Sequence, residues 1–110
     1  MSEKYLELQI NNPNEAVMLL GMSDANITLL EETYKVQIIT RGEVIQVAGE
    51  DEELKARAIA VLNELLKVIR KNINIDQRDV ATAIEMASKG TIEYFAELYD
   101  EEIARKTKRK

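Results

Sequence analysis

The chain has 110 residues, of which 45% are hydrophobic and 32% charged, with one proline and neither cysteine nor histidine. This composition is typical of a soluble globular protein with a core, and it excludes disordered, collagen-like and disulfide-stapled chains. Without cysteine or histidine there is no thiolate metal site, and no Ser-His-Asp or Cys-His catalytic arrangement. No charged-then-apolar leader follows Met1 and no long apolar run occurs, so we expect a cytoplasmic protein that does not span a membrane.

Charge is distributed unevenly along the chain. Residues 1–104 hold 20 acidic and 10 basic side chains, a net charge of −10, whereas the last six positions, RKTKRK, hold five basic ones. These five are Arg105, Lys106, Lys108, Arg109 and Lys110. An acidic body repels a nucleic-acid backbone, and a basic tail attracts one weakly and without reading its sequence. We interpret 105–110 as a solvated end or a connector, with phosphate contact as the alternative.

The first predicted elements are a strand and a short helix. In YLELQI, residues 5–10, apolar and polar residues alternate with the period of a half-buried strand. Asn12 is placed to cap a helix, Pro13 suits the first helical position, and Glu15 falls where a capping box places an acid. A short apolar helix follows, and Gly21 is expected to end it by adopting a positive φ.

A second helix is predicted after this glycine, with Ser23 or Asp24 as its cap and its apolar residues at helical spacing. Residues 36–41 and 44–47 then alternate on either side of a Gly-Glu turn, which predicts a β-hairpin.

The segment 50–72 is the longest predicted helix, with acids at its start and bases at its end, as the helix dipole favours. Its apolar stripe is Leu54, Ala58, Val61, Leu62, Leu65 and Ile69. Two more helices follow, the first capped by Asp76 and ended by Gly90, the second capped by Thr91. The apolar side of the last helix carries Ile92, Phe95, Tyr99 and Ile103. We expect this stripe to pack back on the preceding helix; a homo-oligomer interface is the alternative.

These elements predict an α+β fold with the order β-α-α-β-β-α, a three-stranded sheet with helices on one face, and two C-terminal helices. We divide the chain into a domain over 1–72, a helical extension over 73–104 and the tail 105–110.

Catalytic chemistry is not predicted. The four glycines, at positions 21, 42, 49 and 90, form no phosphate-binding motif, so the chain has no ATP site of its own. The acidic clusters 50–53 and 100–102 are interpreted as a helix start and a solvated face and not as metal sites, with a surface for a basic partner as the alternative at 100–102.

The predicted order resembles that of the type I KH domain, in which a G-x-x-G loop between two helices clamps about four backbone nucleotides. Gly21, Met22, Ser23 and Asp24 occupy that loop, so an aspartate stands at the second glycine position. We expect its carboxylate to cap the next helix and to weaken phosphate binding by repulsion.

Two basic residues flank this region of the chain. Lys35 is interpreted as a helix end and Arg41 as a hairpin edge, with phosphate contact as the alternative for both. The predicted hairpin strands are aliphatic and offer no aromatic platform for base stacking, so a stacking residue has to come from elsewhere in the chain.

The run GMSDANITLLEETYKVQIITRGEVIQVAGE, together with INIDQRDVATAIEMASKG, looks like the amino-terminal region of the PhoH family of P-loop ATPases. In that family a KH-like domain precedes the ATPase domain. The resemblance implies a cytoplasmic bacterial protein linked to RNA metabolism and phosphate starvation, often a ring-like oligomer, whose ATP and magnesium bind in the ATPase domain and not in this chain.

On this resemblance the chain is expected to be a non-catalytic accessory domain that positions the downstream ATPase domain, contacts partners or supports oligomer assembly, with a weakened grip on nucleic acid. The alternative is an RNA or single-stranded nucleic-acid binding module that uses the loop of residues 21–24, the hairpin and the basic tail.

Overall fold

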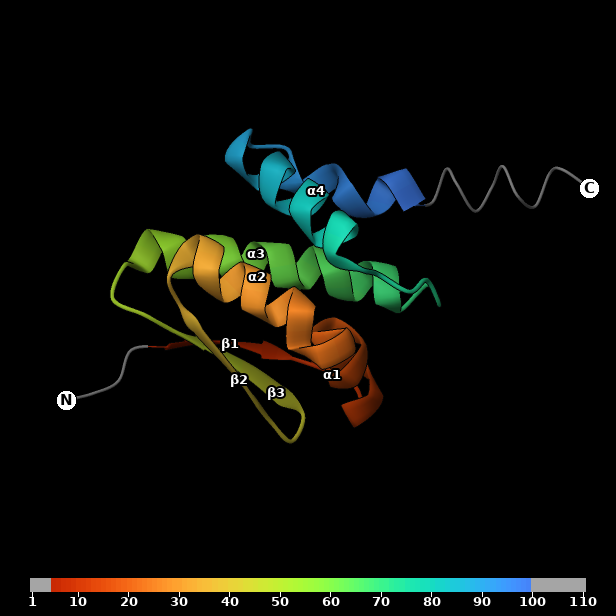
Figure 1. Cartoon of the computed structure of the whole chain (residues 1–110), viewed down its shortest axis with the longest axis horizontal. Coiled ribbons are helices and arrows are strands. Elements are labelled where there is room, and N and C mark those ends of the chain that lie inside the picture. Colours follow the sequence, from red (N-terminus) through yellow and green to blue (C-terminus); the bar gives the residue numbers. More distant parts are fainter. Residues whose placement is uncertain (1–4, 100–110) are drawn as a thin grey trace, which may run out of the picture.

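The computed structural model describes residues 5–99, with the backbone alone for Met22 (Figure 1). Its elements in chain order are β1 (Tyr5–Gln9), α1 (Pro13–Leu20), the 3₁₀ turn η1 (Met22–Asp24), α2 (Ala25–Tyr34), β2 (Gln37–Arg41), β3 (Val44–Ala48), α3 (Glu52–Ile69), α4 (Gln77–Ser88) and the 3₁₀ turn η2 (Ile92–Tyr94). Residues 95–99 continue as a helix. The predicted α+β class and element order are confirmed. The basic tail, Ile103 and the acids at 100–102 lie outside the described residues.

The three strands form one antiparallel sheet in the order β1-β3-β2, so the hairpin places β3 in the centre. In its register Leu8 faces Ile45 and Ile38 faces Val47 across the strands. The alternation predicted from the sequence therefore turns one set of side chains toward the core and leaves the other set on the open side of the sheet.

Helices α1, α2 and α3 lie on one side of the sheet, and α4 with the helical residues after it lies beyond α2 and α3 (Figure 1). The opposite side of the sheet carries no helix among the described residues. The chain is thus layered as sheet, inner helices and outer helices.

α3 supplies the centre of the core. Five residues of its predicted stripe are buried: Ala58, Val61, Leu62, Leu65 and Ile69. Val80 from α4 and Phe95 from the last helical segment are also fully buried, and they belong to the same apolar cluster as the sheet residues. Packing of the last helix against the rest of the chain is therefore confirmed for Phe95.

Two of the predicted helix caps are confirmed. Asn12 accepts the amide hydrogen of Glu15, and Asp76 forms a complete capping box at the start of α4. Asp51, which the sequence predictions did not name as a cap, accepts the amide hydrogens of Glu53 and Leu54 at the start of α3. Glu15 does accept a backbone N–H, but from Asn11 at 2.7 Å and not from the cap residue.

Two predicted caps are wrong. Asp24 precedes α2 in the left-handed region, with φ 60° and ψ 23°, and its side chain makes no capping hydrogen bond. A capping residue normally has extended dihedrals, which aim its side chain at the amides of the first turn, and the left-handed backbone turns Asp24 away from them. Thr91 makes no cap either, because its hydroxyl donates to the carbonyl oxygen of Met86 at 3.3 Å.

Candidate functional site

The loop of residues 21–24 joins α1 to α2 and begins at a glycine that the fold itself requires. Gly21 has φ 77° and ψ −179°, a conformation almost confined to glycine. A Cβ atom at this position would lie 2.5 Å from the Nδ2 atom of Asn26, whose side chain is only 2% exposed. Close packing against Asn26 accounts for this glycine without any bound phosphate.

At the other end of the loop, Ser23 and Asp24 adopt backbone angles that are more common for glycine. Their φ values are 55° and 60°, in the left-handed region that aspartate tolerates better than most residues. Both residues are exposed. The carboxylate of Asp24 does not fill the amide site at the start of α2, but it places a negative charge beside that site and so disfavours a phosphate there.

A second acidic residue, Glu31, links α2 to the edge of the sheet. The Oε2 atom of Glu31 accepts the backbone N–H of Ile38 at 2.9 Å, and so binds an amide on the outer edge of β2. The helix also carries Glu32 and has no basic residue over its length, Ala25–Tyr34. The loop, α2 and the adjoining strand edge therefore form an acidic flank, which opposes a polyanion.

A hollow of about 330 Å³ lies on the other flank of the loop, where Gly21, Ala25 and Asn26 meet residues 75–77 at the start of α4. The Nδ2 atom of Asn26 has no hydrogen-bond partner, and its accessible surface is nearly zero. The carboxylate of Asp76 borders this hollow and accepts the amides of Arg78 and Asp79, with the Asp79 amide the larger cause of a lowered Asp76 pKa. The hollow thus offers an anion no basic side chain.

The two basic residues singled out in the sequence do not join the loop. Lys35 has φ 57° and ends α2, as predicted, so it lies roughly 15 Å from Asp24 at a rise of 1.5 Å per residue. It borders a hollow of about 480 Å³ together with two acids, Glu50 and Asp51. Arg41 ends β2 and faces the open side of the sheet. Phosphate contact by either residue stays a prediction.

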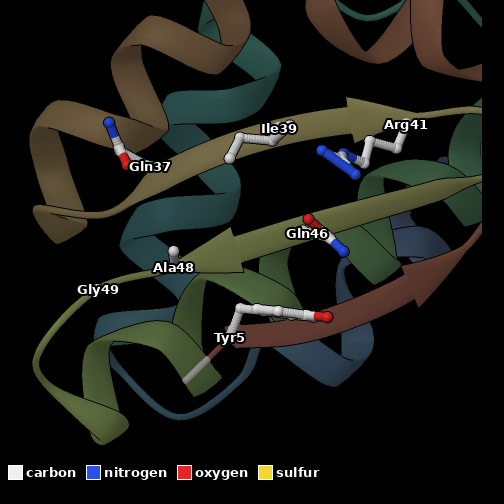
Figure 2. A pocket seen from close by; sticks show the side chains of 7 residues that line it. All are labelled: Tyr5, Gln37, Ile39, Arg41, Gln46, Ala48 and Gly49. Atoms are coloured by element: carbon white, nitrogen blue, oxygen red, sulfur yellow. The ribbon is translucent and has the colours of Figure 1, made fainter. Parts of the chain in front are cut away.

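The open side of the sheet contains a hollow of about 500 Å³, shown in Figure 2. The side chains around it come from all three strands: Tyr5 from β1, Gln37, Ile39 and Arg41 from β2, and Gln46 and Ala48 from β3. Gly49, just after β3, completes the lining. The sequence predictions missed this site. A signal for it was present in the alternation of residues 5–10, which places Tyr5 on the face opposite Ile10 and therefore on the outer side of the sheet.

Two kinds of feature are absent from residues 5–99, a cluster of metal-ligating side chains and a helix that could cross a membrane. Within that range no group of three or more acidic side chains has the arrangement of a metal site. None of its helices combines the length and apolar character that a bilayer span needs. In the acidic cluster 50–53, Asp51 caps α3, while Glu52 and Glu53 pair with Lys55 and Arg57 at 3.1 Å each. These acids have local structural partners.

Comparison with known proteins gives one informative result. No family model matches the chain, and no solved structure matches it. The chain is 44% identical, over 112 aligned residues, to a PhoH-like protein of Bacillus subtilis (strain 168). The alignment covers the whole of this chain and 35% of that protein, so the chain spans about a third of the length of the curated relative it matches. The similarity to a PhoH-like protein that the sequence indicated is thus confirmed over the full 110 residues.

Proposed function

We propose that this chain is a KH-like, non-catalytic accessory domain of a PhoH-like P-loop ATPase. It positions the ATPase part, contacts partners or supports oligomer assembly, and its grip on nucleic acid is weak. The observation that carries the proposal is 44% identity over the whole chain to a PhoH-like protein that is about three times longer. ATP and magnesium then belong to the part of that protein outside the alignment, since no phosphate-binding motif occurs in this sequence.

The weak grip on nucleic acid is inferred from the loop and its surroundings. Gly21 is explained by its packing on Asn26, Asp24 puts a carboxylate beside the start of α2, and Glu31 binds the β2 edge. An accessory role in a cytoplasmic ATPase linked to RNA metabolism and phosphate starvation is compatible with such a surface, because partner contact does not require phosphate binding.

The experiment that tests this proposal removes the aligned segment from the full-length B. subtilis relative. We expect the remaining protein to bind a fluorescent ATP analogue with a Kd within about twofold of that of the intact protein. We also expect the molar mass of its assembly, measured by light scattering, to differ from that of the intact protein. Adding the present chain in trans is expected to restore the molar mass of the intact assembly. Loss of ATP binding after the deletion, or ATP hydrolysis by the present chain alone, would overturn the proposal.

A second candidate function is an RNA or single-stranded nucleic-acid binding module. It is favoured by the confirmed order β-α-α-β-β-α with an antiparallel three-stranded sheet, and by the basic tail at 105–110. Fluorescence anisotropy with a short single-stranded RNA at low salt tests it. Micromolar binding that survives deletion of 105–110 would favour this candidate over the weak grip proposed above.

A further inference from the structure

The open side of the sheet gathers the side-chain types that recognise a nucleobase. Tyr5 and Ile39 are both exposed large apolar residues, at 43% and 42%, and they border the same hollow from opposite edge strands (Figure 2). The amide side chains of Gln37 and Gln46 lie along it, and Ala48 leaves space in the central strand. An aromatic ring stacks on any base, while amides donate to and accept from its polar edge.

Charge on this side differs from that of the rest of the chain. Arg41 lines the hollow and provides a guanidinium for a phosphate or for stacking on a base. Glu7 also points outward, but its Oε2 atom accepts a hydrogen bond from Gln46 Nε2 at 3.1 Å. These are the charged residues of the outward-facing set in the three strands, so this side is locally near neutral although residues 1–104 sum to −10.

Size decides between a nucleotide and a protein partner. Three strands about 4.8 Å apart and five residues long make a face of roughly 14 by 17 Å. That is far below the roughly 800 Å² that each partner of a stable protein interface buries. The hollow of about 500 Å³, in contrast, falls within the range of small-ligand pockets.

We propose that the open side of the sheet binds single-stranded RNA, with one base stacked on Tyr5, its edge read by Gln37 and Gln46, and a neighbouring phosphate at Arg41. This inference rests on the second candidate function and moves its site away from the loop of residues 21–24. The aromatic residue that the hairpin lacks is supplied by β1, which lies beside β3 in the sheet.

The test measures anisotropy of fluorescein-labelled hexamers of adenylate and of uridylate against the full chain at 50 mM salt. We expect Tyr5→Ala to weaken binding about tenfold or more, the effect of losing a base–aromatic stack, and Tyr5→Phe to stay within about twofold. Arg41→Gln is expected to weaken binding and to reduce the salt slope by about one. The matched control is Tyr94→Ala, which removes a 51% exposed tyrosine on the outer helices.

Two further measurements locate the ligand on the sheet and distinguish an RNA strand from a mononucleotide. The side-chain amide signals of Gln37 and Gln46 are expected to shift in NMR spectra when RNA is added. Free adenosine monophosphate is expected to compete only at far higher concentration than the hexamer, whereas equal competition would make the ligand a mononucleotide and overturn the assignment to RNA.

Several outcomes contradict the inference, and each is distinct. If Tyr5→Ala binds as the parent does while Asp24→Asn changes affinity, the loop is the site and the second candidate function survives. If the full chain binds no RNA, the inference and the second candidate both fall, and the accessory role stands on its own test. If light scattering shows a dimer that Tyr5→Ala dissolves, the open side is a protein interface.

Discussion

Arg70 at the end of α3 holds Glu15 in the first turn of α1 through two hydrogen bonds, from Nε to Oε2 at 2.9 Å and from Nη2 to Oε1 at 3.1 Å. The Glu15 side chain is largely buried, and that of Arg70 is about a third exposed. The hydrogen bond from Arg70 lowers the pKa of Glu15 against the opposing effect of burial, and the same bond raises the pKa of Arg70.

Replacing Glu15 by Gln is expected to lower the free energy of unfolding by about 1–2 kcal/mol at pH 7, because a partly buried guanidinium loses its charged partner. Because the Arg70 side chain is partly exposed, this loss of stability is expected at the lower end of the range for buried ion pairs. Urea denaturation of the parent and the variant measures the difference in the free energy of unfolding. The control is Glu53→Gln, which breaks the exposed pair with Arg57 and should cost less than about 0.5 kcal/mol. Equal losses in both variants would contradict a special role for Glu15.

The same carboxylate predicts how stability depends on pH. Since the pKa of Glu15 is lower in the folded chain than its usual 4.5, the folded state favours the charged form. Its contribution is complete above pH 4.5 and is lost as the pH falls through the folded value. The stability difference between the parent and Glu15→Gln should therefore narrow in acid. Unfolding curves at pH 7, 4.5 and 3 test this, and a gap that widens in acid would disprove it.

Gly21→Ala is expected to destabilise the chain by at least about 2 kcal/mol, since the new Cβ both strains the backbone and meets the buried Asn26 side chain. Gly90→Ala is a matched control with nearly the same φ, 78° against 77°, and no atom within 4 Å of the added Cβ. Gly90→Ala should lower the free energy of unfolding by only about 1 kcal/mol, the cost of a side chain at a left-handed backbone position. Thermal unfolding of both variants separates the steric effect from the backbone effect.

Asp24→Gly is expected to raise the free energy of unfolding by up to about 1 kcal/mol, because the left-handed backbone suits glycine and no capping bond is lost. For a domain of this size, that corresponds to a rise in Tm of a few degrees. Asp24→Asn is the control, because asparagine tolerates the same dihedrals and removes only the charge. A clear loss of stability in Asp24→Gly would show that the carboxylate caps α2 in solution.

Phe95→Ala is expected to lower the free energy of unfolding by about 3–5 kcal/mol, the range for truncating a fully buried aromatic side chain. Phe95 also contacts the ring of Tyr99, at a centroid distance of 5.1 Å. The neighbouring Tyr94→Ala removes an exposed ring and should change stability by less than about 0.5 kcal/mol.

The Phe95 experiment also addresses the boundary predicted at residue 72. One cooperative transition that shifts as a whole would show that the helices after this residue are part of the same folding unit. Two transitions, with only one affected by Phe95→Ala, would support the division into a domain and an extension.

Periodicity was enough to predict the elements of this fold, because each one buries a regular stripe or an alternating face. The segment at 50–72 shows this best, since its predicted stripe is the centre of the core. The wrong cap at Asp24 came from a single backbone angle. Asp24 has a residue type that commonly caps helices, but its φ of 60° removes that role, and nothing in the one-letter code fixes such an angle beforehand.

The candidate site was predicted less well, for a different reason. The hollow on the sheet depends on β1 lying beside β3, and strand order is a tertiary property that local patterns do not contain. Once that order is known, Tyr5 is seen to line the same hollow as Gln46 and Ile39. The Glu15–Arg70 pair was missed in the same way, since its partners are 55 positions apart.

Strand order also has a consequence during translation. Because β1 pairs with β3, β1 leaves the ribosome without its partner strand and stays unpaired until residues 44–48 have cleared the exit tunnel. During that interval Leu6 and Leu8 remain exposed to solvent, and exposed apolar segments of a nascent chain are the ones that bind chaperones or aggregate. Release of a chain truncated before β3 would leave this apolar strand permanently unpaired.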